Sequence, residues 1–191
     1  LSPTQRAVGN ALEIREAVAT VKGEGPPDFT ELVLDACARL LALSDLGVDV
    51  AEGRCRAEVA VADGSALARY EEWVRAQGGD PRLEVLETAP VIREVRAPRG
   101  GVVSSVGALA VGVAALELGA GRRTKADPVD HAVGVVCVAK RGAEVRAGDV
   151  LAEVHARDEA SAAAGVEAVA AAYVVGDTTP SSPGILLDVL G

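Results

Sequence analysis

The sequence predicts an α+β chain in which the helices come first and the strands follow. From Ala11 to about Gln77, apolar residues recur at the spacing of one helix face. After Pro90, short runs rich in valine alternate with glycine, a pattern typical of strands joined by turns. A length of 191 residues allows one large domain or two small ones. We therefore place a domain boundary near Pro90, with residues 1–89 mainly helical and residues 90–191 α+β.

Four helices are expected in the first part, and each is bounded by a cap or by glycine and proline. They run from Ala11 to Val21, from about Phe29 to Leu43, from about Val50 to Ala62, and from Ala66 to Gln77. Asp28 and Glu31 have the spacing of a capping box at the start of the second helix. Its apolar spacing predicts a buried face made of Leu32, Val33, Ala36, Leu40 and Leu43. Trp73 is expected to anchor the packing of the fourth helix.

In the second part, strands alternate with two helices. The expected strands cover residues 91–97, 101–106, 132–139 and 150–155, with a terminal strand at 185–190. One helix is expected over residues 108–118, closed by Gly119, and another is expected to begin at Asp158. Gly119 to Arg122 is glycine-rich and basic, but it follows a helix. A phosphate cradle precedes a helix, so these residues are interpreted as a helix C-cap.

Composition excludes several classes of function. The net charge of -9 argues against nucleic acid and against an anionic membrane as partners, because both bind basic surfaces. The three cysteines are odd in number and have no Cys-x-x-Cys spacing, which favours a reducing cytoplasm and argues against a zinc site. No apolar run is long enough to span a membrane. His131 and His155 have no serine or cysteine partner in the local pattern, so a nucleophilic triad is not indicated.

The start of the first helix offers oxygen ligands. Backbone carbonyls between Thr4 and Ala7 can turn toward a carboxylate one or two helical turns further on, supplied by Glu13 or Glu16. Ligation by oxygen alone suits a hard cation. The alternative is that both glutamates are solvent-facing helix residues.

Five motifs, in order along the chain, resemble the pyrimidine-nucleoside phosphorylases, the family that contains thymidine phosphorylase. They are R-A-V-G-N-A-L-E-I-R-E-A at residues 6–17 with G-E-G-P at 23–26, A-Q-G-G-D at 76–80, L-G-A-G-R at 118–122, D-H-A-V-G at 130–134, and G-D at 148–149 with V-H-A at 154–156. The family's Gln-Pro-Leu-Gly before the arginine is replaced here by Ser2-Pro3-Thr4-Gln5.

This resemblance implies the end of a nucleoside-binding α/β domain, over residues 1–89, followed by a smaller α+β domain with a hammerhead or barrel-sandwich-like β core. It implies a cytoplasmic pentosyltransferase, homodimeric in the family, that cleaves a pyrimidine nucleoside with phosphate to the free base and (deoxy)ribose 1-phosphate. The family's phosphate loop and base-binding residues precede residue 6. No catalytic or cofactor-binding residue is therefore assigned here, and the chain alone is expected to be inactive. The carried-over site is for a potassium ion, at Thr4, Ala7 and Glu16.

A second hypothesis is a non-catalytic binding or carrier-like module. Residues 97–103 and 142–151 resemble the two halves of biotinyl or lipoyl carrier domains. In those carriers a lysine at an exposed hairpin bears the cofactor. Residues 154–158 occupy the corresponding place and contain no lysine.

Overall fold

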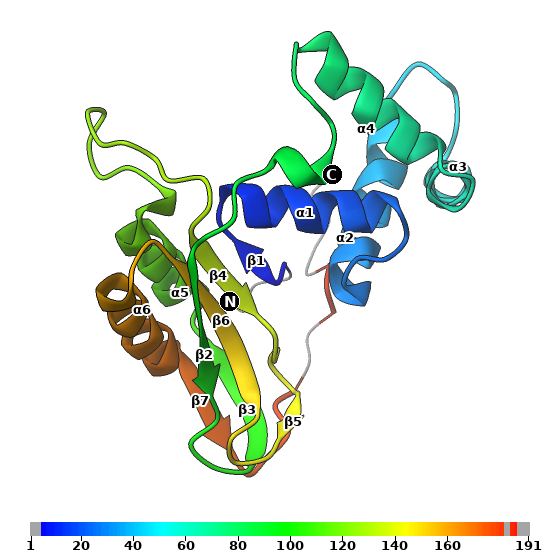
Figure 1. Ribbon diagram of the computed structural model, residues 1–191. Helices are drawn as coiled ribbons and strands as arrows, with labels where there is room; N and C mark the ends of the chain where they lie inside the picture. Colours follow the sequence, from blue (N-terminus) through cyan, green and yellow to red (C-terminus); the bar gives the residue numbers. More distant parts are fainter. Residues whose placement is uncertain (1–4, 182–183, 187–191) are drawn as a thin grey trace. The chain divides into compact units, whose positions relative to one another are not determined.

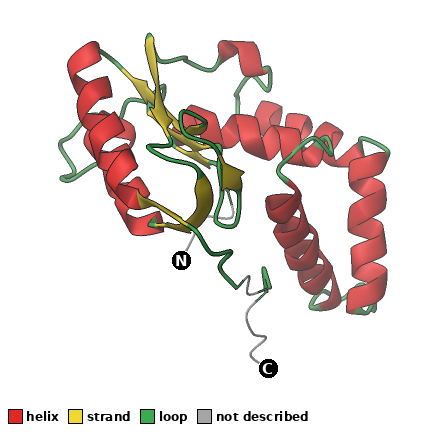
Figure 2. Cartoon of the chain, turned by 90° about the horizontal axis from the view of Figure 1, so that it is seen from below, coloured by secondary structure: helices red, strands yellow, loops and turns green. Residues whose placement is uncertain are grey.

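The computed structural model describes residues 5–181 and 184–186, and contacts divide the chain into two units (Figure 1). The sheet unit comprises residues 1–14 and 86–182, and the helical unit comprises residues 15–85 and 183–191. Every strand of the described residues belongs to the sheet unit (Figure 2). This division places residues 1–14 with the strands, whereas the sequence pattern predicts a single boundary near Pro90.

The sheet unit contains two antiparallel sheets. The four-stranded sheet has the order β1 (Ala7–Val8), β4 (Gly134–Cys137), β6 (Val150–Ala156), β2 (Val91–Arg96). The three-stranded sheet has the order β5 (Glu144–Val145), β3 (Gly101–Val106), β7 (Tyr173–Gly176). Strand β6 is therefore interior, and β1 lies at an edge. The predicted α+β class is confirmed.

Two helical segments share the core of the sheet unit. They are α5 (Ala108–Ala115), which continues into a π-helical turn at Leu116–Ala120, and α6 (Glu159–Ala172), which lies beside it (Figure 1). A Cβ at Gly165 would lie 2.8 Å from a methyl carbon of Val154, so α6 approaches β6 closely because it carries a glycine there. Asp158 caps α6 by accepting from the Ser161 N–H at 2.7 Å, at the residue where the sequence predicts that this helix begins.

Small aliphatic side chains make up the core. Val103, Val135, Val154 and Val169 are all fully buried, and they come from both sheets and from α6; Val133, just before β4, is also fully buried. The Tyr173 hydroxyl at the start of β7 donates to the Leu151 carbonyl of β6 at 3.0 Å. Both sheets thus contribute to one hydrophobic cluster.

The helical unit is built on a close crossing of two helices. Its helices are the later turns of α1 (Asn10–Val21), then α2 (Pro27–Ala42), α3 (Val50–Ala62) and α4 (Ser65–Ala76), with a 3-10 turn at Leu83–Val85. Ala38 of α2 is 1% exposed and packs on Gly53 of α3, where a Cβ would lie 2.6 Å from the Ala38 carbonyl oxygen. Glycine at position 53 therefore allows the two helices to approach each other closely.

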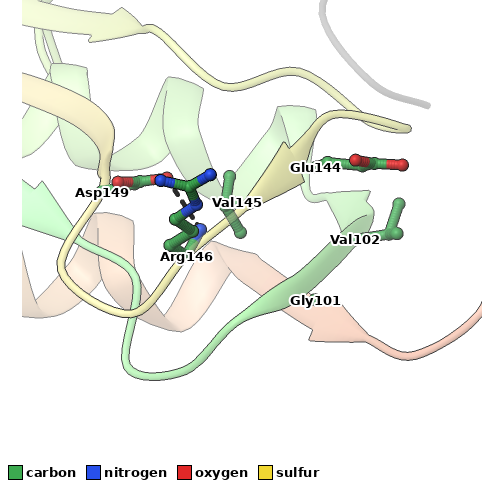
Figure 3. Close-up of a pocket in the computed structure, with 6 residues that line it drawn as sticks. All are labelled: Gly101, Val102, Glu144, Val145, Arg146 and Asp149. Carbon is green, nitrogen blue, oxygen red and sulfur yellow. Dashed lines mark hydrogen bonds between the residues drawn. The ribbon is translucent and has the colours of Figure 1, made fainter.

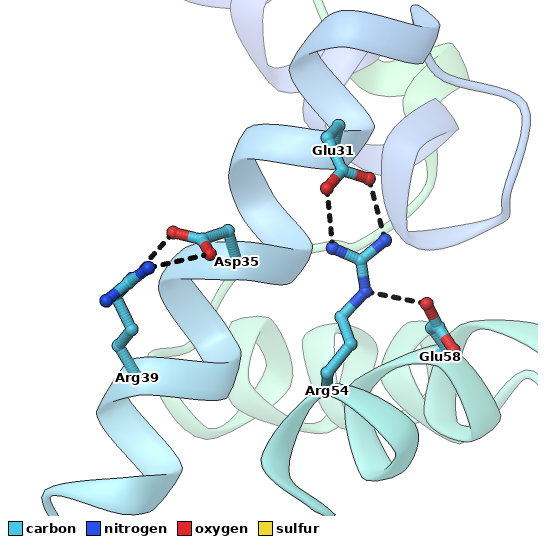
Figure 4. Close-up of polar contacts among 5 residues, drawn as sticks. All are labelled: Glu31, Asp35, Arg39, Arg54 and Glu58. Atoms are coloured by element: carbon cyan, nitrogen blue, oxygen red, sulfur yellow. Dashed lines mark hydrogen bonds and ion pairs between the residues drawn. The ribbon is translucent and has the colours of Figure 1, made fainter. Parts of the chain in front are cut away.

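Ion pairs flank this crossing (Figure 4). The Arg54 guanidinium of α3 donates to both oxygens of Glu31 on α2, at 2.8 and 2.7 Å, and to Glu58 at 2.6 Å. These hydrogen bonds raise the pKa of Arg54 and lower the pKa of Glu31. A second pair, Arg39 with Asp35 at 2.8 Å, lies within α2.

Three expectations for the helical unit are wrong. Helix α2 begins at Pro27, and its N-cap residue is Pro26, whose side chain has no atom that can accept a hydrogen bond. The expected capping box is not formed, since Asp28 lies inside the helix and the Glu31 carboxylate accepts from Arg54. Its predicted buried face is largely in solvent, with Leu40 67% and Leu43 84% exposed. Trp73 is 61% exposed, so its ring does not anchor α4.

Three of the short strands differ from the sequence expectations. β1, β5 and β7 lie where no strand is predicted, whereas β2, β3, β4 and β6 lie where strands are predicted. Of the expected terminal strand, Ile185 and Leu186 are not in a strand, and residues 187–190 lie outside the described residues. Across the part of the chain that the structure describes, no helix has the length and apolar character needed to cross a membrane.

Candidate functional site

The junction between β1 and α1 is held by two glycines that face each other. Gly9 has φ +150°, and a Cβ there would lie 2.6 Å from the Val133 carbonyl oxygen. Gly134 has φ +155°, and a Cβ there would lie 2.4 Å from the Val8 carbonyl oxygen. L-residues rarely adopt such φ values. The first and fourth family motifs thus meet backbone to backbone.

Hydrogen bonds then fasten the first turn of α1 to the segment at residues 119–134. The Asn10 side-chain amide donates to the Ala120 carbonyl at 2.8 Å, and the Ala11 N–H donates to the His131 carbonyl at 3.0 Å. The Gly9 N–H donates to the Glu13 carboxylate at 2.9 Å. Backbone N–H groups at a helix start have no carbonyl partner within the helix, so the contacts of the Gly9 and Ala11 N–H satisfy donors that would otherwise lack one.

Asp130 organises the segment at residues 119–134. Its N–H donates to the Gly119 carbonyl at 2.9 Å, and its carboxylate accepts from the Ala132 N–H at 3.0 Å. Arg157, which follows β6, pairs with that carboxylate at 3.3 Å and covers Gly119, where a Cβ would lie 2.6 Å from its guanidinium. Gly119 has φ +108° and ends the helical segment, which agrees with the predicted C-cap.

The basic residues between these contacts belong to a turn that is exposed to solvent. Arg122, Arg123 and Lys125 are exposed, and Arg123 forms an ion pair with Glu117. The Asp127 carboxylate accepts from the Thr124 N–H at 2.8 Å and from the Arg123 N–H at 3.0 Å. The hydrogen bonds from Thr124 lower the pKa of Asp127.

Of the three residues expected to bind potassium, Ala7 and Glu16 are described and Thr4 lies outside the described residues. The Cys137 N–H donates to the Arg6 carbonyl at 2.7 Å, and Ala7 pairs with Val136. Hydrogen-bonded and non-hydrogen-bonded pairs alternate in an antiparallel ladder. The Ala7 carbonyl is therefore directed away from β4.

The two candidate glutamates have different surroundings. Glu13 uses one carboxylate oxygen for the Gly9 N–H, whereas Glu16, one turn of α1 further on, is half-buried. The backbone carbonyl of Glu16 accepts from the buried Thr20 hydroxyl at 2.8 Å. Thr20 in turn packs on Gly25 of the G-E-G-P motif, where a Cβ would lie 2.3 Å from that hydroxyl. The motif therefore fixes the end of α1.

The cation at these residues stays a prediction of the resemblance. Carbonyl and carboxylate oxygens are the ligands that hard cations prefer. The Glu13 carboxylate bonds to the N–H before its own helix, and the resemblance places the carboxylate ligand at Glu16. Within the described residues, no group of three or more His, Cys, Asp or Glu side chains is placed to hold a metal ion.

His155 lies in the interior of the four-stranded sheet. Its side chain is 9% exposed, and among the described residues neither ring nitrogen has a hydrogen-bond partner. Burial lowers the pKa of His155, and the Glu153 carboxylate at 3.8 Å opposes that effect. The backbone partner of His155 on β4 is Gly134, so this imidazole lies next to the glycine crossing.

A shallow depression of about 460 Å³ lies at the start of β3. It is lined by Gly101, Val102, Glu144, Val145, Arg146 and Asp149 (Figure 3). The Asp149 carboxylate accepts from the Arg146 N–H at 2.7 Å and so closes the turn before β6. These polar groups stabilise a turn, and they do not form a catalytic arrangement.

Comparison with known proteins shows what parts of this chain resemble. Residues 102–176 match the family model described as the pyrimidine nucleoside phosphorylase C-terminal domain. Residues 102–176 are therefore similar to the C-terminal domain of pyrimidine nucleoside phosphorylases. The chain is 40% identical over 161 residues to the pyrimidine-nucleoside phosphorylase of Staphylococcus haemolyticus and 42% identical over 161 residues to that of Geobacillus stearothermophilus. Each alignment covers 82% of this chain, and the chain spans 37% of each relative's length.

The phosphorylase resemblance located the motifs but not the contacts among them. The roles of Asn10, Asp130 and Arg157 were missed, because each bonds to a residue far away in the sequence or to a backbone carbonyl. Gly9 and Gly134 were the one signal in the sequence from which these contacts could have been predicted. A glycine inside each of two separate motifs indicates a close backbone approach, but it does not say which two segments meet.

Proposed function

We propose that this chain is part of a pyrimidine-nucleoside phosphorylase, which catalyses reversible phosphorolysis of a pyrimidine nucleoside to the free base and (deoxy)ribose 1-phosphate. The observation that carries the proposal is the extent of the similarity. Identity of about 40% covers 82% of the chain, well beyond the matched domain at residues 102–176. Pyrimidine nucleoside and phosphate are then the substrates of the complete protein, which would be a homodimer as in the family.

In this proposal the chain positions other groups and does not perform the chemistry. The described residues hold the β1–α1 junction against β4 and the segment at residues 119–134, and no residue of the chain is assigned a catalytic role. Contacts to phosphate and to the leaving base would come from the part of the enzyme that the resemblance places before residue 6. We therefore expect the 191-residue chain alone to be inactive.

A potassium ion would be held by the Ala7 carbonyl, the Glu16 carboxylate and the Thr4 carbonyl. Bound there, the ion would supply positive charge that orders the loop before α1. The chain's own contribution is to direct the Ala7 carbonyl away from β4 and to keep the Glu13 carboxylate on the Gly9 N–H.

The carrier-like alternative is not favoured by any observation. Of residues 154–158, which would correspond to the carrier hairpin, the first three lie in interior strand β6, and Arg157 and Asp158 lead directly into α6. A cofactor-bearing lysine would have to stand on an exposed hairpin, and no hairpin tip occurs at that position.

The test is an assay of base release. The complete protein and the 191-residue chain are each incubated with uridine or thymidine, with and without phosphate, and the free base is separated by chromatography. We expect phosphate-dependent release by the complete protein and none by the 191-residue chain. Absence of release by the complete, folded protein would contradict the proposed function, and release by the 191-residue chain would contradict the assignment of the chemistry to other residues.

A further inference from the structure

Helix α2 is apolar on two nearly opposite sides. Ala38 packs on Gly53 of α3 and marks the inner side. Residues two positions apart in a helix are about 200° apart around its axis, so Ala36 and Leu40 lie nearly opposite Ala38. They belong to a second side, which we call the outer face of α2 and which consists of Leu32, Val33, Ala36, Leu40 and Leu43.

The outer face has the composition of a buried surface. All of its side chains are apolar, whereas a helix face in solvent is normally polar. The charged residues Glu31, Asp35 and Arg39 follow one another at i, i+4 spacing between the inner side and the outer face, and each is bonded to a partner of opposite charge (Figure 4). Leu40 and Leu43 are nevertheless among the most exposed large apolar residues that the structure describes.

The helical unit has little hydrophobic core of its own. Only two aliphatic side chains among its described residues are buried, those of Val18 and Ala38. The large hydrophobic cluster belongs to the sheet unit throughout. A unit of about 70 residues needs a buried core of its own or a partner that completes one. The outer face of α2 is therefore suited to complete a core with a further apolar surface.

We infer that the outer face of α2 is an internal interface of the complete enzyme, covered by an apolar surface of the chain that precedes residue 6. The inference rests on the proposed function, which assigns the contacts to phosphate and base to that preceding part. The relatives have room for such an occupant, because this chain spans 37% of the length of each. An uncharged face rich in leucine suits a permanent interface, since permanent interfaces are more hydrophobic than transient ones.

The test captures the occupant by photo-cross-linking in the complete protein. Leu43 is replaced by p-benzoylphenylalanine, and the irradiated protein is digested and analysed by mass spectrometry. Leu46, which follows α2 and is also exposed, provides a second labelling position if the bulky group at position 43 prevents docking. We expect these labels to capture peptides that precede residue 6. The control label replaces Glu87, an exposed residue of the connection between the units, and should not capture those peptides.

Substitutions measure what the covered face contributes. In the complete protein, Leu40→Glu and Leu43→Glu place an unpaired charge in apolar surroundings, so the urea midpoint of unfolding should fall. Leu43→Met is the matched control and should stay near the wild type, because hydrophobic swaps of similar volume are tolerated. In the 191-residue chain the same face is in solvent, and all three variants should unfold at the wild-type midpoint.

Several results would overturn the inference. They are capture of the sheet unit of the same chain, a cross-linked species of doubled mass, which would make a second copy the occupant, and no capture from either position. Equal capture of the preceding peptides from position 87 would also contradict it. Phosphorolysis of uridine is measured on the unlabelled protein. Capture of the preceding chain without phosphorolysis would support the inference and refute the proposed function, and phosphorolysis without capture would do the reverse.

Discussion

Glu13 and Glu16 lie one turn apart at the start of α1, and the Glu13 carboxylate accepts from the Gly9 N–H. Glu16→Gln keeps the size and helix propensity of the side chain but removes the charge on which a hard cation depends. We expect the complete protein with this change to lose most of its response to potassium, with little change in its unfolding midpoint in choline chloride.

Glu13→Gln is the matched change one turn earlier. Its side-chain oxygen still accepts from the Gly9 N–H, so the helix start is preserved. Potassium titrations of phosphorolysis should therefore resemble those of the wild type. The reverse ranking of the two variants would move the carboxylate ligand from Glu16 to Glu13.

His155 makes the stability of the sheet unit depend on pH. Burial lowers its pKa in the folded chain, whereas an unfolded chain holds the histidine pKa near about 6.5. As the pH falls below about 6.5, the unfolded state takes up a proton that the folded state resists, so stability is lost toward the lower folded pKa. His155→Leu should narrow the difference in free energy of unfolding between about pH 7.5 and pH 5, by about 1.4 kcal/mol for each unit of lowering.

Denaturant titrations at the two pH values measure this difference, and proton NMR of the imidazoles measures the pKa itself. The chain has two histidines, so His131→Gln assigns the remaining signal to His155. A His155 signal that titrates at or above the ordinary histidine value would contradict the expectation.

At the scale of the elements, two helix glycines have opposite roles. Gly53 of α3 faces Ala38 of α2, and a Cβ would lie 2.6 Å from a backbone oxygen that cannot move without shifting the helix. Gly112 of α5 has no heavy atom within 4 Å of the same position. Gly53→Ala should destabilise by about 1–3 kcal/mol through overpacking, whereas Gly112→Ala should stabilise by about 0.5–1 kcal/mol through helix propensity. Denaturant unfolding measures the change in free energy of unfolding for each variant. A Gly53→Ala variant as stable as the wild type would rule out the close helix crossing.

The helices were predictable because periodicity and caps act locally. The limits of α3 and α4 lie within a residue of those that the sequence indicates, since Asp49 and Gly64 mark their starts. The buried face of α2 was not predictable from the same pattern. Apolar spacing says which side chains share a face, and Leu40 and Leu43 do, but it does not say whether another element covers that face.

The short strands could not be predicted for a related physical reason. A two-residue strand such as β1 or β5 has no period of its own, and its existence depends on the partner strand that a distant segment supplies. The cation-site residues could be named through the resemblance, and Ala7 could be placed on a loop before a helix. The direction of its carbonyl depends on the register between β1 and β4. That register is known only from the pairing of Ala7 with Val136 in the structure.

At the scale of the whole molecule, the connection between the units is exposed near Glu84 and Glu87. A glutamate-specific protease should cut there first, because exposed segments without regular pairing are cleaved preferentially. Residues 1–14 belong to the sheet unit and β1 pairs with β4, so the two pieces should remain associated after the cut. Gel filtration of the nicked protein under native conditions should show one species that contains both masses. Separate elution of the pieces would favour a linear division near Pro90.

The pairing of β1 with β4 also has a consequence for the order of folding. Asn10 and Ala120 are 110 residues apart, and closing so long a loop costs more chain entropy than forming the hairpins and helices inside it. Contacts of high sequence separation form after local ones in most small domains. The strand that carries the Ala7 carbonyl should therefore dock last and open first, on a sheet whose β2, β4 and β6 are already assembled. Amide protons of β1 would then exchange through partial opening at a lower free energy than those of β6, while the rest of the sheet stays folded.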